Sequence, residues 1–133
     1  MSEIETITAR FAMSGADAST VPGIDGEWLE AMVMTKTYTT GLVGSAVLHF
    51  AWSGTSDTER GYIAAERISG TLDDGRHGSF TVHHGALADP ADPSAWGYII
   101  PGSGTDDFAG FAGQARIHHD DEGAYFVFEV PSP

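Results

Sequence analysis

The chain has 133 residues, of which 41% are hydrophobic and 11% aromatic, as is typical of one globular domain rather than a disordered segment. It has no cysteine, which excludes disulfide bonds and cysteine-based zinc or redox sites. Its net charge of −13 disfavours nucleic-acid and membrane-surface partners, and because no stretch has the apolar run of a signal peptide or a membrane helix, we expect a cytoplasmic protein.

Apolar and polar residues alternate with a period of two along almost the whole chain, and no helical periodicity of useful length is present. Clusters of Gly, Pro, Asp and Ser divide this pattern into eight predicted strands, at residues 4–13, 30–40, 42–53, 60–72, 76–87, 95–101, 113–119 and 123–130. Residues 14–29 are predicted to be a connection, with one helical turn around 27–29. Residues 88–94, which contain two prolines, are predicted to be a surface loop. A second loop is expected at 101–113, with Phe108 and Phe111 beneath it.

Eight short antiparallel strands fit either a closed up-and-down barrel or a sandwich. The hairpin-like spacing of the middle strands favours an all-β chain that forms a single eight-stranded antiparallel β-barrel domain over residues 1–133, with meander topology. The interior of such a barrel is just wide enough to be filled by side chains or to hold one small ligand. The function depends on which of these two alternatives holds.

The segment 61–85 predicts one β-hairpin, because two alternating runs flank the loop at 73–75, which ends in glycine and suits a type I turn with a left-handed bulge. A two-residue loop would slip the register and set apolar residues opposite polar ones, so we prefer the longer loop. One face of the hairpin is then apolar except for Glu66 and His84. The predicted register pairs Leu72 with Arg76, Ile68 with Phe80, Glu66 with Val82 and Ala64 with His84.

The same alternation places Lys36 on the inward face of the strand at 30–40, together with Met32, Met34 and Tyr38. Met13 and His119 also fall on inward faces of their strands. Burial of a lone charge is costly, so Lys36, Glu66 and His84 are expected to pair with one another or to surround trapped water or a ligand. The inward aromatic residues predicted in the other strands include Phe50, Trp52, Tyr62, Phe80, Trp96 and Tyr98.

Two interpretations of these inward groups stay open. In the first, Lys36, Glu66 and His84 form a structural network that fixes strand register. In the second, they form the polar end of an aromatic pocket, where Glu66 and His84 act as general acid or base and Lys36 and Tyr38 anchor a carboxylate or carbonyl. The residues expected to contact a substrate are Met32, Met34, Tyr38, Phe50, Trp52, Tyr62, Phe80, Trp96 and Tyr98.

No metal or cofactor is predicted. The doublets His83-His84 and His118-His119 lie in predicted strands, where neighbouring side chains point to opposite faces, so each doublet offers one ligand per face. The glycines at 102–104 lack a third glycine at the spacing of a nucleotide-binding loop, and the two aspartates that follow would repel a phosphate.

Three segments of the chain resemble the DUF3224 family of small bacterial proteins: MTKTYTTGLVGSAVLHF (34–50), GYIAAERISGTLDDGRHGSFTVHHGA (61–86) and IPGSGTDDFAGFAG (100–113). The matching positions include Lys36, Tyr38, Tyr62, Glu66 and His84. The resemblance implies an eight-stranded barrel like that of plant allene oxide cyclase. Barrels of that kind include enzymes that confine a flexible, unsaturated substrate in an aromatic cavity, where it cyclises.

The function we predict on this basis is binding of a small, largely apolar organic molecule, with cyclisation or isomerisation assisted by acid and base groups in the barrel. The first alternative is a non-catalytic carrier with the same pocket. The second is a filled barrel that serves as a structural or interaction domain, with homodimer formation through outer Thr and Val faces.

Overall fold

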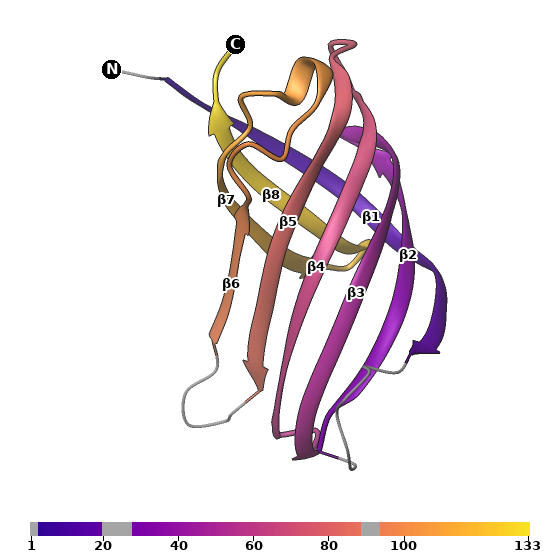
Figure 1. Ribbon diagram of the computed structural model, residues 1–133. Coiled ribbons are helices and arrows are strands. Elements are labelled where there is room, and N and C mark those ends of the chain that lie inside the picture. The colour runs from indigo at the N-terminus through magenta and orange to yellow at the C-terminus, as the bar shows by residue number, and fades with distance from the viewer. Residues whose placement is uncertain (1–2, 20–27, 89–93) are drawn as a thin grey trace.

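The computed structural model describes residues 3–19, 28–88 and 94–133, and these residues form a closed antiparallel barrel (Figure 1). Each strand pairs with the next one along the chain, and β8 closes the barrel against β1. The predicted eight-stranded meander barrel is therefore confirmed. No helix in the described part of the chain is long and apolar enough to cross a membrane. The strands are β1 (Ile4–Ser19), β2 (Glu30–Thr40), β3 (Leu42–Ser56), β4 (Glu59–Leu72), β5 (His77–Ala88), β6 (Ser94–Ile99), β7 (Gly113–Asp120) and β8 (Gly123–Pro131), and a short 3-10 helix, η1 (Asp106–Phe108), lies between β6 and β7.

The β4–β5 hairpin has the predicted register, with Glu66 opposite Val82 and Ala64 opposite His84. The backbone N–H of Leu72 donates to the carbonyl of Arg76 at 2.8 Å, which closes the turn. Gly75 has a φ of +94°, the left-handed conformation that glycine adopts without steric cost. Because side chains alternate along a strand, this turn determines that Glu66 and His84 both face the interior.

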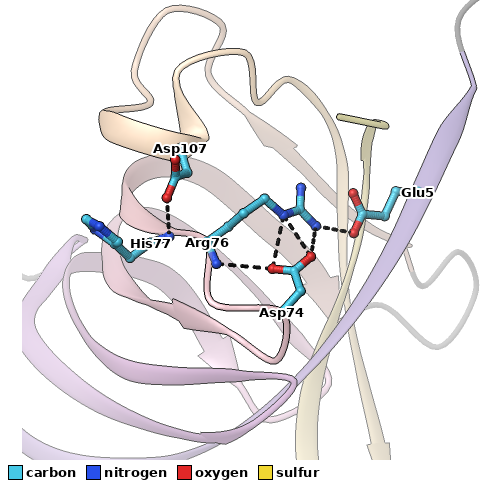
Figure 2. A network of polar contacts seen from close by, with 5 residues as sticks. All are labelled: Glu5, Asp74, Arg76, His77 and Asp107. Carbon is cyan, nitrogen blue, oxygen red and sulfur yellow. Dashed lines mark hydrogen bonds and ion pairs between the residues drawn. The ribbon is translucent and has the colours of Figure 1, made fainter.

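Polar contacts tie the tip of this hairpin to two other segments at the same end of the barrel (Figure 2). The carboxylate of Asp74 accepts from the backbone N–H of Arg76 at 3.1 Å and from its Nε at 2.9 Å. The Arg76 guanidinium also pairs with Glu5 of β1. The backbone N–H of His77 donates to Asp107 of η1 at 2.9 Å. The hairpin tip, β1 and the η1 loop are thereby joined.

The loop at 101–113 covers this end and fills it with aromatic rings, as predicted. Phe108 and Phe111 are both buried. The ring of Phe80 packs edge-on against Phe108, with centroids 5.6 Å apart, and against Phe128, with centroids 5.3 Å apart. One end of the barrel is therefore closed by a packed aromatic core, and we call it the closed end.

The predicted connection at 14–29 is wrong for residues 14–19, which continue β1 and pair with the first half of β2. A register shift between Met13 and Gly15 marks a bulge, and Met13 is exposed rather than inward. The Gly- and Ser-containing sequence has little intrinsic strand preference, but the long partner strand supplies the hydrogen bonds. The pairing, rather than the local composition, therefore sets the length of β1.

Parts of two predicted connections lie outside the described residues, namely 20–27 and 89–93. Of the helical turn predicted around 27–29, Trp28 and Leu29 are described and are not helical. The two edge residues of the loop predicted at 88–94 belong to strands: Ala88 is the last residue of β5, and Ser94 is the first residue of β6.

The inward orientation predicted for Trp96 and Tyr98 is wrong. Both are exposed, at 41% and 54%, whereas Gly97 and Ile99 between and after them are buried. A Cβ at position 97 would lie 2.1 Å from the carbonyl oxygen of Ala115, so the inward position opposite His84 has no room for a side chain. The inner and outer faces of β6 are therefore the opposite of those predicted, and its large rings lie on the outer surface. His119, also predicted inward, is exposed as well.

Candidate functional site

A buried carboxylate lies at the centre of the candidate site. Glu66 of β4 is fully buried, and Lys36 of β2 and His84 of β5 are nearly so. Oxygen Oε1 of Glu66 accepts from Lys36 Nζ at 2.8 Å and from His84 Nε2 at 3.0 Å, while Oε2 accepts from the Tyr38 hydroxyl at 2.6 Å. The structure thus brings together the three predicted acid, base and cationic groups and the predicted hydroxyl donor Tyr38.

The ammonium group of Lys36 has aromatic neighbours as well as a carboxylate. Its Nζ lies 3.9 Å from the ring centroid of Phe11 and 4.9 Å from that of Phe126. Attraction between a cation and the faces of aromatic rings offsets part of the cost of removing the charge from water. These two contacts explain how the core accommodates a lysine.

The charges of this cluster follow from the balance between burial and pairing. Burial raises the pKa of Glu66, but the hydrogen bond from His84 and the charge of Lys36 outweigh it, and the pKa falls below its usual value of 4.5. Burial lowers the pKa of Lys36 despite the opposing effect of Glu66. Burial and the adjacent carboxylate raise the pKa of Tyr38 well above 10.0. At neutral pH Glu66 is therefore ionised and Tyr38 keeps its proton.

We expect this pairing to make the stability of the fold depend on acid pH. Because the pKa of Glu66 is lower in the folded than in the unfolded chain, its contribution is complete above its usual value of 4.5 and is lost as the pH falls through the folded value. Urea unfolding of the wild type and of a Lys36→Met/Glu66→Gln double variant between pH 7 and pH 3 measures this contribution. The wild type should lose stability relative to the double variant below about pH 4.5. A constant difference across this range would contradict the predicted shift.

Tyr62 connects the buried cluster to the rest of the interior. Its hydroxyl lies 3.2 Å from Nδ1 of His84, and its ring stacks on Phe50 with centroids 4.8 Å apart. Burial is the main cause that raises the pKa of Tyr62, with Glu66 adding to it. We refer to Lys36, Tyr38, Tyr62, Glu66 and His84 as the Glu66 network.

A cavity of about 380 Å³ lies near the β3–β4 turn. This turn is at the end of the barrel opposite the η1 loop (Figure 1). Its walls are mostly apolar, and Tyr62 is the member of the Glu66 network that lines it. We call the end of the barrel that holds this cavity the open end. Buried aromatic rings thus pack the interior at the closed end, whereas this cavity lies at the open end, so each of the two alternatives drawn from the sequence describes one part of the barrel. The side chains most relevant to the cavity are Met32, Phe50, Trp52, Tyr62 and Leu87, with Arg60 as its charged residue.

Four of the predicted substrate contacts, Met32, Phe50, Trp52 and Tyr62, line this cavity. Tyr38 instead bonds to Glu66, and Met34 is half-buried on the same face of β2 without lining the cavity. Phe80 belongs to the aromatic core of the closed end, and Trp96 and Tyr98 face outward, so these three lie away from the cavity.

The sequence reasoning missed several lining residues near the strand ends. Arg60 has the same alternation as Tyr62, and Ala86 has the same alternation as His84, so continuing the pattern two residues further would have found both. Arg60 is paired with exposed Asp57 at 3.6 Å. No group of three or more His, Asp or Glu side chains among the described residues is arranged to hold a metal ion.

Comparison with known proteins agrees with this architecture. The model of the family described as a protein of unknown function, DUF3224, matches residues 7–129. A crystal structure of a DUF3224 protein of unknown function from Shewanella oneidensis MR-1 superimposes with a TM-score of 0.81 and 21% sequence identity, covering 98% of this chain and 100% of that one. No curated protein is significantly similar. Because the family model spans most of the barrel, this chain belongs to the DUF3224 family.

Proposed function

We propose that this barrel binds a small, largely apolar organic molecule in the cavity at its open end. The observation that carries the proposal is the cavity itself, because its volume of about 380 Å³ falls within the range of small-molecule sites and its walls are mainly apolar and aromatic. Tyr62 joins the wall of the cavity to the buried, hydrogen-bonded Glu66 network. Such a preformed site binds a ligand with little reorganisation.

A neutral fluorescent probe tests this proposal. N-phenyl-1-naphthylamine should gain fluorescence on binding and should quench Trp52, which lines the cavity. Ala86→Phe fills the cavity and should weaken probe binding at least about ten-fold, because the added ring occupies the space of the ligand. Ala65→Phe is the matched control, since Ala65 is exposed on the outer face of β4 and should leave binding unchanged. Absence of binding to the wild type, or equal binding to the two variants, would refute the proposal.

The Glu66 network favours a catalytic form of the same function, in which the barrel isomerises or cyclises the bound molecule. The order tyrosine, histidine, carboxylate places the groups as in a catalytic triad, with the Tyr62 hydroxyl in the position of the reacting group and His84 as its base. Native mass spectrometry of the purified protein identifies any ligand that co-purifies with it.

Incubation of that ligand with the protein in D₂O then separates an enzyme from a carrier. An isomerase that moves a proton through Tyr62 should add deuterium to the ligand, and Tyr62→Phe should abolish the exchange. The exposed Tyr98→Phe substitution should not affect it. A ligand that stays unlabelled with the wild type would contradict proton transfer through Tyr62 and favour a carrier.

A further inference from the structure

We propose that the cavity selects neutral ligands that donate a hydrogen bond, such as apolar alcohols and phenols, because Tyr62 presents an acceptor oxygen to them. This inference rests on the proposed function and adds the chemical class of the ligand. It follows from the direction in which hydrogen bonds run through the Glu66 network. That direction is determined at the buried end, by Glu66, and is transmitted outward to the cavity.

Glu66 and His84 share one hydrogen bond. An ionised carboxylate accepts hydrogen bonds and donates none. Glu66 Oε1 lies 3.0 Å from Nε2 of His84 and 2.8 Å from the ammonium of Lys36, so both neighbours must donate to it. Nε2 of His84 therefore carries a hydrogen.

The other ring nitrogen of His84, Nδ1, faces the Tyr62 hydroxyl. The single negative charge of Glu66 is already matched by the positive charge of Lys36 at 2.8 Å. A protonated His84, which is itself buried, would add a second positive charge with no negative partner. This charge balance favours the uncharged imidazole. With its hydrogen on Nε2, Nδ1 has a lone pair that accepts the hydrogen of the Tyr62 hydroxyl at 3.2 Å.

The Tyr62 hydroxyl has one hydrogen to donate and an oxygen that can accept. A phenol has one hydrogen, and here His84 takes it, so the Tyr62 oxygen keeps its lone pairs. Because Tyr62 lines the cavity, a ligand that reaches its hydroxyl meets an acceptor. A ligand hydroxyl or N–H group satisfies this acceptor. A carbonyl, ether or carboxylate oxygen of a ligand is also an acceptor, so it forms no hydrogen bond with the Tyr62 oxygen. Donation by Tyr62 to a ligand would leave the lone pair of His84 Nδ1 without a donor.

A pair of probes that differ in one hydrogen-bond donor tests the inference. The affinities of 2-naphthol and 2-methoxynaphthalene are measured by displacement of N-phenyl-1-naphthylamine from the wild type, Tyr62→Phe and Tyr98→Phe. The ratio of the two affinities in favour of the naphthol should be about five- to ten-fold higher for the wild type than for Tyr62→Phe, as expected for one hydrogen bond. Tyr98 is exposed on the outer surface, so its variant should keep the wild-type ratio.

The outcomes distinguish this inference from the proposed function. Equal ratios in all three proteins, with binding of both probes abolished by Ala86→Phe, would overturn the acceptor role of Tyr62 and leave ligand binding intact. Failure of every probe to bind the wild type would instead remove the proposed function. Nitrogen-15 NMR of the free protein tests the direction of the chain without any ligand. It should find the hydrogen of His84 on Nε2, and a hydrogen on Nδ1 would overturn the inference.

Discussion

Replacing Glu66 by glutamine is expected to lower the free energy of unfolding by about 3–5 kcal/mol, because it leaves the buried ammonium of Lys36 without an opposite charge. Glutamine has nearly the size of glutamate, so the loss reports on charge and hydrogen bonding rather than on a cavity. Urea unfolding followed by tryptophan fluorescence measures it. Exposed Glu129 of β8 supplies the control, since Glu129→Gln changes the same charge at the surface and should leave stability nearly unchanged.

A double-mutant cycle with Lys36→Met extends this test. Lys36→Met alone should also be strongly destabilising, because it leaves the Glu66 carboxylate buried without its cation. The combined Lys36→Met/Glu66→Gln variant removes both charges and should be far more stable than the sum of the single losses implies. Additive losses would show that the two side chains do not interact in the folded protein, and the assignment of the Glu66 network would then be wrong.

Replacing Phe108 by alanine is expected to cost about 3–5 kcal/mol of unfolding free energy, because it removes a fully buried ring from the closed end. The Phe108 ring stacks on Phe111 with centroids 4.5 Å apart and meets Phe80 edge-on. Urea unfolding measures the loss.

The control for this substitution is an exposed aromatic residue of the same barrel. Tyr98→Ala removes a ring of similar size from the outer surface and should have a much smaller effect. If Phe108→Ala were no more destabilising than Tyr98→Ala, the loop at 101–113 would not be closing this end of the barrel.

The inward placement of Glu66, His84 and Lys36 could be predicted because it depends on local rules. The glycine at 75 selects the turn, the turn sets the register, and the register determines the face of every residue in β4 and β5. The same reasoning failed for Trp96 and Tyr98. In the short strand β6, the large rings suggested an inward face, whereas the carbonyl oxygen of Ala115 leaves room there for Gly97 alone.

The all-β barrel and the inward ionisable groups follow from the amino-acid sequence, because the alternation of side chains along a strand and the chemistry of a turn are properties of neighbouring residues. Three features were decided only by the tertiary structure: the aromatic rings of Phe11 and Phe126 around Lys36, the hydrogen-bonded path from Glu66 to Tyr62, and the division into a closed and an open end. Each depends on side chains from strands that are distant in sequence and meet when the barrel closes. Their distances and the volume left between them are set by packing across the whole interior, which cannot be predicted from any single segment.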